Sequence, residues 1–151
     1  LYDHAMAAEK LDLLEVVEKD LRQLIQIKPD HAHAYNALGY TFAERGIRLE
    51  EARQLTEKAL SLDPGNPLIM DSLGWAYFRK GDYKLALETL LEAEDLLLKA
   101  NTPDPAVYDH IGDTYQRLGK IEDALRYWRK SNDMKKSGTL DGKIKQYQER
   151  Q

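Results

Sequence analysis

Small or apolar side chains recur along this chain at intervals of three and four residues, the spacing of one face of an α-helix. Between residues 33 and 45 they fall at Ala34, Ala37, Leu38, Thr41 and Phe42. A second stripe of the same kind runs from 49 to 62. Glycine ends the first segment and an Asp-Pro-Gly-Asn-Pro stretch ends the second, and both are common helix-stop signals. The pattern therefore predicts two helices joined by a short turn.

The same pair of helices is predicted twice more downstream. One pair occupies 67–80 and a segment from 83 to a break at 101–105, which lies later than in the preceding pair. The next pair starts with Asp104 as N-cap and Pro105 in the first helical position, and Gly119 provides its turn. We expect an extra helical turn or a longer loop between these two pairs.

A Leu-Gly or Ile-Gly dipeptide occupies the same place in each first helix. A large residue precedes it by three positions, and an aromatic residue follows the glycine by three. The frames are Tyr35-x-x-Leu38-Gly39-x-x-Phe42, Met70-x-x-Leu73-Gly74-x-x-Tyr77 and Tyr108-x-x-Ile111-Gly112-x-x-Tyr115. A glycine inside a helix costs about 1 kcal/mol relative to alanine, so its recurrence predicts close helix–helix approach there.

The frames repeat after 35 residues (from 38 to 73) and again after 38 residues (from 73 to 111). A period of this size is typical of stacked helical repeats. Matching Pro29 to Pro64 adds an earlier, degenerate repeat with Ala5 at the glycine position and Val17 at the position of Ala52. We predict one all-α domain over 1–151, with repeats at 1–30 (truncated), 31–65, 66–103 and 104–137 and a capping helix at 139–151.

The predicted capping helix has a single thin apolar stripe. Leu140, Ile144 and Tyr147 are spaced for one helix face, and the remaining positions are mostly polar. A terminal helix with a polar outer face is what keeps the end of a repeat array in water.

The frame resembles the tetratricopeptide repeat (TPR), whose pattern is W-x₂-L-G-x₂-Y, then A-x₃-F, then P. The second element appears here as Ala86-x₃-Leu90, as Ala124-x₃-Trp128 and, after one inserted residue, as Ala52-x₃-Thr56. The resemblance covers about residues 2–136. It implies a right-handed α-solenoid whose concave groove, lined mainly by the first helices, binds peptides or protein segments.

Two phrases carry a narrower resemblance. Residues 33–41 and 71–77 are similar to the C-terminal repeats of large bacterial envelope TPR lipoproteins. Some members of that group act as adaptors, for example for a carboxyl-terminal processing protease. The resemblance implies an adaptor in the bacterial envelope or periplasm, with the cytoplasm as the alternative. The chain begins at Leu1 without Met, so we expect it to be a fragment of a longer protein.

Composition narrows the function classes. The 151 residues are 32% charged with a formal net charge of −4, which disfavours a nucleic-acid partner because such proteins usually carry a basic surface. A pentatricopeptide-type RNA reader, which also has helical pairs of this length, is disfavoured for the same reason. No apolar run approaches the roughly 20 residues that span a bilayer, and the absence of Cys rules out disulfides and thiolate sites.

The repeat frame also predicts which side chains face the groove. They are Tyr2, Met6, Asn36, Tyr40, Asp71, Trp75, Phe78, Asp109 and Asp113. Tyr40, Trp75 and Asp113 each follow the frame glycine directly. Since the frame already has its own core aromatics, we expect Tyr40 and Trp75 to stand exposed as binding anchors. The alternative is that they pack against the neighbouring repeat.

The C-terminal half of this groove would be acidic, because it holds the carboxylates of Asp71, Asp109 and Asp113. Asp71 and Asp109 stand where TPR co-chaperones that hold a carboxylate need a donor, so that type of clamp is disfavoured. A protein or peptide segment with Lys or Arg and one apolar anchor is the partner that we expect. The alternative is a solvated charged face.

The remaining candidate motifs do not indicate chemistry. His31-x-His33 places its two rings off a common helix face and lacks a third ligand, so no metal site is expected. Asp109-His110-x-x-Asp113 has no accompanying nucleophile or phosphate-binding loop. We therefore predict a non-catalytic binding scaffold without cofactors. The alternative is a structural spacer, or a module that self-associates through its repeat ends into a homo-oligomer.

Overall fold

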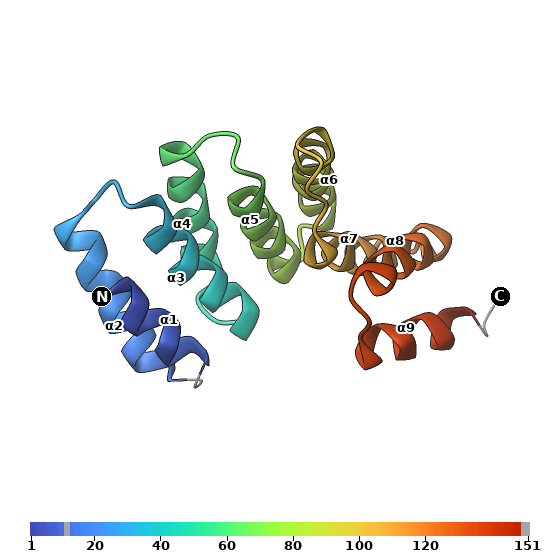
Figure 1. Ribbon diagram of the computed structural model, residues 1–151, viewed down its shortest axis with the longest axis horizontal. Helices are drawn as coiled ribbons and strands as arrows, with labels where there is room; N and C mark the ends of the chain where they lie inside the picture. Colours follow the sequence, from blue (N-terminus) through green and yellow to red (C-terminus); the bar gives the residue numbers. More distant parts are fainter. Residues whose placement is uncertain (11–12, 149–151) are drawn as a thin grey trace.

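The computed structural model describes residues 1–10 and 13–148, and all regular elements in these ranges are helices (Figure 1). They are α1 Tyr2–Lys10, α2 Leu14–Ile27, α3 Ala32–Arg45, α4 Leu49–Leu62, α5 Pro67–Lys80, α6 Tyr83–Lys99, α7 Pro105–Arg117, α8 Ile121–Met134 and α9 Gly138–Gln148. The predicted all-α solenoid with a capping helix is confirmed. The predicted last residues of that helix, 149–151, lie outside the described residues. The assignment of repeats to 1–30, 31–65, 66–103 and 104–137 stays a prediction.

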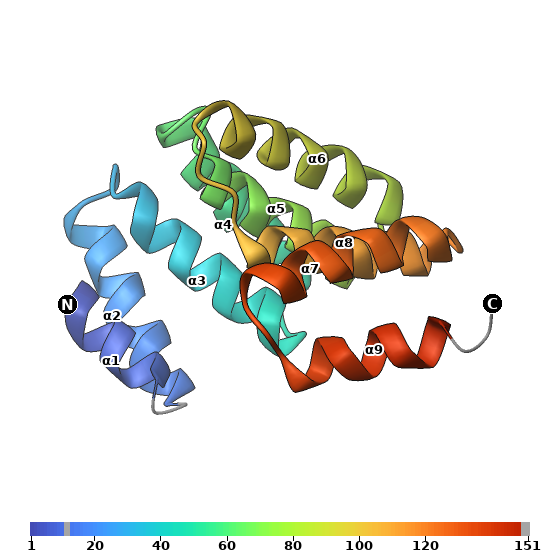
Figure 2. The same ribbon diagram turned by 45° about the vertical axis from the view of Figure 1, so that its right-hand side comes forward.

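Successive helical pairs follow one another along an arc. α3 packs on its own partner α4 and also on α5, the first helix of the next pair, and α4 packs on α5 as well. The same relation joins α5, α6 and α7. Figures 1 and 2 show α9 below α7 and α8 at the C-terminal end of the arc, where it packs on α8.

Helices begin and end at residues that cap them. The Asn66 side chain accepts hydrogen bonds from the backbone N–H groups of Leu68 and Ile69 at the start of α5, and Asp104 caps α7 in the same way. Gly46 ends α3 in the left-handed conformation, with φ of 68°. α3 begins one residue before the predicted position because His31 Nδ1 accepts from the backbone N–H of Ala34 at 3.0 Å. His31 is thus a helix cap.

The frame glycines are contact points between the two helices of a pair. A Cβ added to Gly39 would lie 2.8 Å from Thr56 Cγ2, and one added to Gly74 would lie 2.7 Å from Leu90 Cγ. At Gly112 it would lie well inside van der Waals contact with the Trp128 ring. The predicted close approach is confirmed.

The first helical pair buries the same frame positions with different residues. Ala5 and Val17, predicted at the glycine and alanine positions of the frame, are both 0% exposed. Ala8 and Leu21 are buried beside them and belong to a core cluster that continues through α3 and α5.

The longer step between the third and fourth repeats is a helical extension. α6 has 17 residues, whereas α4 and α8 have 14 each. Asn101, in the left-handed region with φ of 56°, then turns the chain toward α7. The expected extra helical turn is therefore present.

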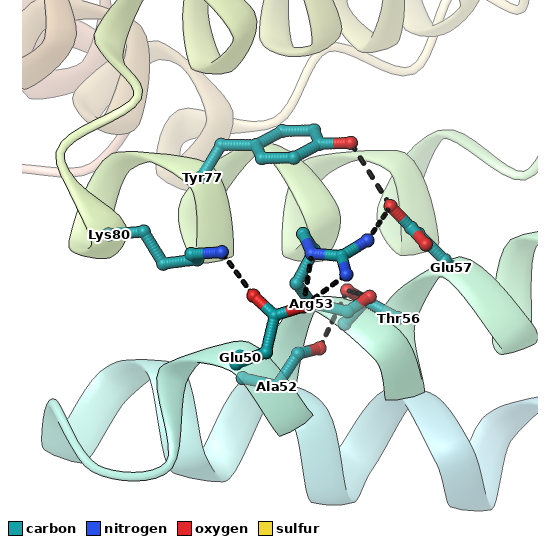
Figure 3. A network of polar contacts seen from close by, with 7 residues as sticks. All are labelled: Glu50, Ala52, Arg53, Thr56, Glu57, Tyr77 and Lys80. Carbon is teal, nitrogen blue, oxygen red and sulfur yellow. Dashed lines mark hydrogen bonds and ion pairs between the residues drawn. The ribbon is translucent and has the colours of Figure 1, made fainter.

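A polar network joins the outer faces of the second and third pairs (Figure 3). Arg53 on α4 binds both Glu50 and Glu57, one turn away on either side. Glu50 also binds Lys80 at the end of α5, and the Tyr77 hydroxyl donates to Glu57 at 3.2 Å. Arg53, followed by Lys80, lowers the pKa of Glu50 to about 2. The pairs are therefore joined by exposed ion pairs in addition to the apolar core.

We expect Gly112→Ala to lower the free energy of unfolding by about 1–3 kcal/mol, because the added methyl group must displace the buried Trp128 ring. The matched control is Gly142→Ala in α9, where an added Cβ meets nothing within 4 Å. That variant should be as stable as the parent or more stable by up to about 1 kcal/mol. Urea unfolding followed by circular dichroism measures both, and equal effects at the two sites would contradict the packing argument.

Candidate functional site

The nine residues predicted for the groove differ in exposure. Asp71, Trp75 and Phe78 are buried, with 7% of Trp75 exposed. The half-buried ones are Tyr2, Met6, Asn36, Tyr40, Asp109 and Asp113. The expectation that Trp75 stands exposed is therefore wrong, and the alternative, packing against the neighbouring repeat, describes it.

Trp75 is held between two rings. Its indole stacks on Phe78 one turn further along α5, with ring centroids 4.5 Å apart. On the other face it stacks on His110 of α7 at 4.1 Å. Its Nε1–H donates to Glu44 of α3 at 3.1 Å. Side chains from three consecutive first helices thus meet at this indole, which explains its burial.

The N-terminal half of the predicted set also packs more than it projects. Tyr2, Met6 and Tyr40 contact the core cluster that runs from the first to the third pair. Burial, followed by the charges of Glu44 and Asp71, raises the pKa of the Tyr40 hydroxyl.

The predicted acidic half of the groove does not carry free carboxylates. Asp71 pairs with His110 Nδ1 at 2.8 Å. Lys143 of α9 binds Asp109 at 3.1 Å and Asp113 at 2.7 Å. The expectation of an acidic surface is corrected by these contacts. Its cause is α9, because the Lys143 side chain reaches into the groove and does not remain on a solvated outer face. The two carboxylates hold the pKa of Lys143 above its usual value, although burial alone would lower it.

A hollow of about 380 Å³ opens where α5, α7 and α9 face one another, and we call it the α5–α7–α9 hollow. Its walls combine aromatic rings with cationic and amide side chains. The lining residues are Trp75, Phe78, Arg79, Asp113, Gln116, Arg117, Trp128, Lys143, Gln146 and Tyr147.

Three of the predicted residues, Trp75, Phe78 and Asp113, line this hollow, and the others do not. Arg79 and Arg117 were not among the predicted residues. Both lie five positions after a frame glycine, so the repeat frame could have shown that they occupy equivalent places. Nothing in the repeat pattern indicated the contributions of the cap helix.

α9 is fixed as one wall of the hollow by polar bonds to α7. Lys143 bridges to α7 as described, and Gln116 Nε2 donates to the Tyr147 hydroxyl at 3.0 Å. Trp128 Nε1–H donates to Asp113 at 3.0 Å, which joins α8 to the same network. Leu140 is buried beneath them, 4% exposed.

A second hollow, of about 550 Å³, lies between the α4–α5 and α6–α7 connections. Its two carboxylates are already engaged: Asp63 accepts from Asn66, and Asp104 caps α7. It therefore offers no free charged group for a ligand, and the α5–α7–α9 hollow is the better candidate.

Neither a metal cluster nor a membrane-spanning helix is found within residues 1–10 and 13–148. In these ranges no group of three or more His, Asp or Glu side chains is placed to hold a metal ion. No helix in the same ranges has the length and apolarity to cross a membrane.

The His110–Asp71 pair generates a pH prediction. Burial lowers the pKa of His110, but Asp71, with Asp109 and Asp113 nearby, outweighs it and raises the pKa above 6.5. A raised pKa means that the pair stabilises the fold fully below the unfolded value and loses this contribution as pH rises through the folded value.

The free energy of unfolding should therefore differ most between the parent and His110→Gln at about pH 6, and less at about pH 9. Urea unfolding at both values measures the two differences. A gap that widens toward alkaline pH would contradict the protonated pair.

Comparison with known proteins places this geometry in a family. Two family models, both described as Tetratricopeptide repeat, match the chain over residues 2–67 and over residues 69–96 and 105–137. A TPR repeat-containing protein of Pseudomonas aeruginosa is 47% identical over 115 residues, which are 75% of this chain and 18% of that relative. The chain thus spans less than a fifth of the relative's length.

Solved structures agree on the fold. PilF of Pseudomonas aeruginosa matches with a TM-score of 0.79 and 22% identity, over 95% of this chain and 64% of that chain. A thermophilic TPR protein of Thermus thermophilus, TTC0263, matches with a TM-score of 0.78 and 19% identity, over 95% and 77%. The TPR2AB domain of yeast Sti1, in complex with pHSP90, matches with a TM-score of 0.67 and 22% identity, over 79% and 46%. From its repeat frame, its stacked helical pairs and the two matching family models, the chain belongs to the tetratricopeptide repeat family.

Proposed function

We propose that this chain is a non-catalytic scaffold that binds an extended segment of a partner protein in the α5–α7–α9 hollow. The observation that carries the proposal is the hollow itself: an open cleft of about 380 Å³ on the first-helix side of the array, with aromatic rings in its wall. A cleft of this size accommodates a few side chains of an extended segment.

The aromatic wall supplies rigid apolar contact area. Trp75 and Phe78 are almost fully buried, with 7% and 8% of each residue exposed, and both line the hollow. Rings already fixed by packing lose little conformational entropy when a ligand arrives, so contact with them is converted efficiently into affinity. The two rings thus form a rigid floor of the hollow, and Trp75 is not the projecting anchor that the frame predicted.

The comparison with yeast Sti1 supports the same kind of function. That domain was solved in complex with pHSP90, and its helical pairs superpose on 79% of this chain. Because this chain covers only 18% of its Pseudomonas aeruginosa relative, the partner and role of the whole protein remain proposals.

The test uses the chain's own fluorescence. Its two tryptophans, Trp75 and Trp128, both line the hollow. Short random peptides displayed on phage are selected on the chain, and the enriched peptides that lack Trp are synthesised and titrated. We expect saturable changes in tryptophan emission, because a charged or apolar segment bound in the hollow changes the electrostatic surroundings of both indoles.

Site mapping by backbone and side-chain amide chemical shifts provides the control. The side-chain amides of Gln116 and Gln146 line the hollow, whereas Gln54 is exposed on α4, outside it. Shifts at the first two and none at Gln54 are expected. The proposal would be refuted by enriched peptides that shift the Gln54 amide signal and leave the emission of both tryptophans unchanged, because such peptides bind outside the hollow.

Self-association is the alternative, and one observation favours it. Ile27 at the end of α2 is 61% exposed, and Leu13 just before α2 is 48% exposed. These side chains are available to a second copy at the N-terminal end of the array.

Light scattering against concentration separates the two functions. The scaffold proposal expects the mass of a monomer throughout. A mass that rises with concentration, and returns to that of a monomer in the Leu13→Glu/Ile27→Glu variant, would support self-association in its place.

A further inference from the structure

We infer that the α5–α7–α9 hollow selects an acidic segment, whose Asp or Glu side chains bind Arg79 and Arg117 while a neighbouring apolar side chain contacts the Trp75–Phe78 floor. This inference rests on the proposed function and adds the chemistry of the partner. It reverses the basic partner expected from the sequence.

The lining of the hollow carries more positive than negative charge. Its lining holds three cations, Arg79, Arg117 and Lys143, and one carboxylate, Asp113. That carboxylate already accepts from Lys143 at 2.7 Å and from the Trp128 indole at 3.0 Å. A basic segment would therefore meet two uncompensated guanidinium groups, whereas an acidic segment finds complementary charge.

The two arginines also differ from others in the chain. Arg22, Arg48 and Arg53 each form an ion pair with glutamate. Arg79 and Arg117 have no such partner within residues 1–10 and 13–148. Since a guanidinium offers a fork of donors that suits a carboxylate, these two can bind one without first breaking an existing pair.

The helix dipole offers a simpler explanation for the position of the two arginines. Both lie in the last turn of their helices, where a cation is favoured by the helix dipole. A side chain that served only this purpose would be free to extend into solvent. Arg117 instead holds its guanidinium 6.0 Å from the centroid of the Phe78 ring on the neighbouring repeat. Cation–π contact of this kind orients the group along the hollow wall.

Arg79 is confined in a comparable way. A Cβ added to Gly46, at the end of α3, would lie 2.6 Å from Arg79 Nη2. The guanidinium of Arg79 therefore lies against the C-terminal cap of the preceding first helix, in space that the absence of a side chain at Gly46 leaves open. The frame position five after the glycine thus carries Glu44 on α3 and then arginine on α5 and α7. The charge at this frame position changes sign along the array, and the two arginines are the members that line the hollow.

The experiment compares the parent chain with Arg79→Ala/Arg117→Ala in the same phage selection. The matched control is Arg126→Ala/Arg129→Ala, which removes two exposed arginines of α8 that do not line the hollow. The parent and the control should both enrich peptides that have adjacent acidic and apolar residues. The Arg79→Ala/Arg117→Ala variant should lose this enrichment and bind the parent's best peptides about ten-fold or more weakly, with a smaller salt dependence.

The outcomes separate this inference from the proposed function. If the parent enriches no peptide, both fail. Peptides enriched without an excess of Asp or Glu, or acidic peptides bound equally by the Arg79→Ala/Arg117→Ala variant, would overturn the inference and leave the scaffold intact. The selected peptides are also synthesised with an amidated C-terminus. Binding should persist, and its loss would assign the arginines to a chain-end carboxylate and overturn the inference. A thermal melt of each variant confirms that the fold is retained.

Discussion

The contact between a mid-helix glycine and the side chain that fills its notch is the interaction on which the rest of this structure depends. At the C-terminal end, the Trp128 ring lies against Gly112, and this contact brings α8 onto α7. The indole that fills the notch also donates to Asp113, and Asp113 in turn binds Lys143. One packing contact therefore fixes the network that holds α9 and, with it, one wall of the hollow.

Side-chain contacts also join the first helices of successive repeats. His110 of α7 reaches both the Asp71 carboxylate and the Trp75 indole of α5. Burying an imidazole, a carboxylate and an indole together costs desolvation, which their mutual hydrogen bond and ring stacking offset. The result is a rigid wall in the groove. In this array the first helices present rings that the fold has already immobilised.

Local signals in the sequence determined the helices, and pairwise contacts between repeats determined the site. The bounds 49–62 and 67–80 followed from glycine turns, an Asn cap and Pro in the first helical turn, all of which act within a few residues. The burial of Trp75 depends on His110, which lies 35 residues away on another helix, so no local pattern could reveal it. Likewise, the single apolar stripe of α9 predicted that it packs but not that Lys143 binds two carboxylates of α7. The period predicted a set of first-helix residues, while the charge of the surface around them was decided by contacts that the period does not encode.

The most direct test of the account is a double-mutant cycle between Arg117 and one carboxylate of a bound peptide. Affinities are measured for the parent chain and Arg117→Ala, each with a selected acidic peptide and with the same peptide carrying Asn in place of its Asp. If the hollow recognises the carboxylate, the two changes should be coupled by more than about 0.5 kcal/mol. Additive effects at every acidic position of the peptide would contradict the account.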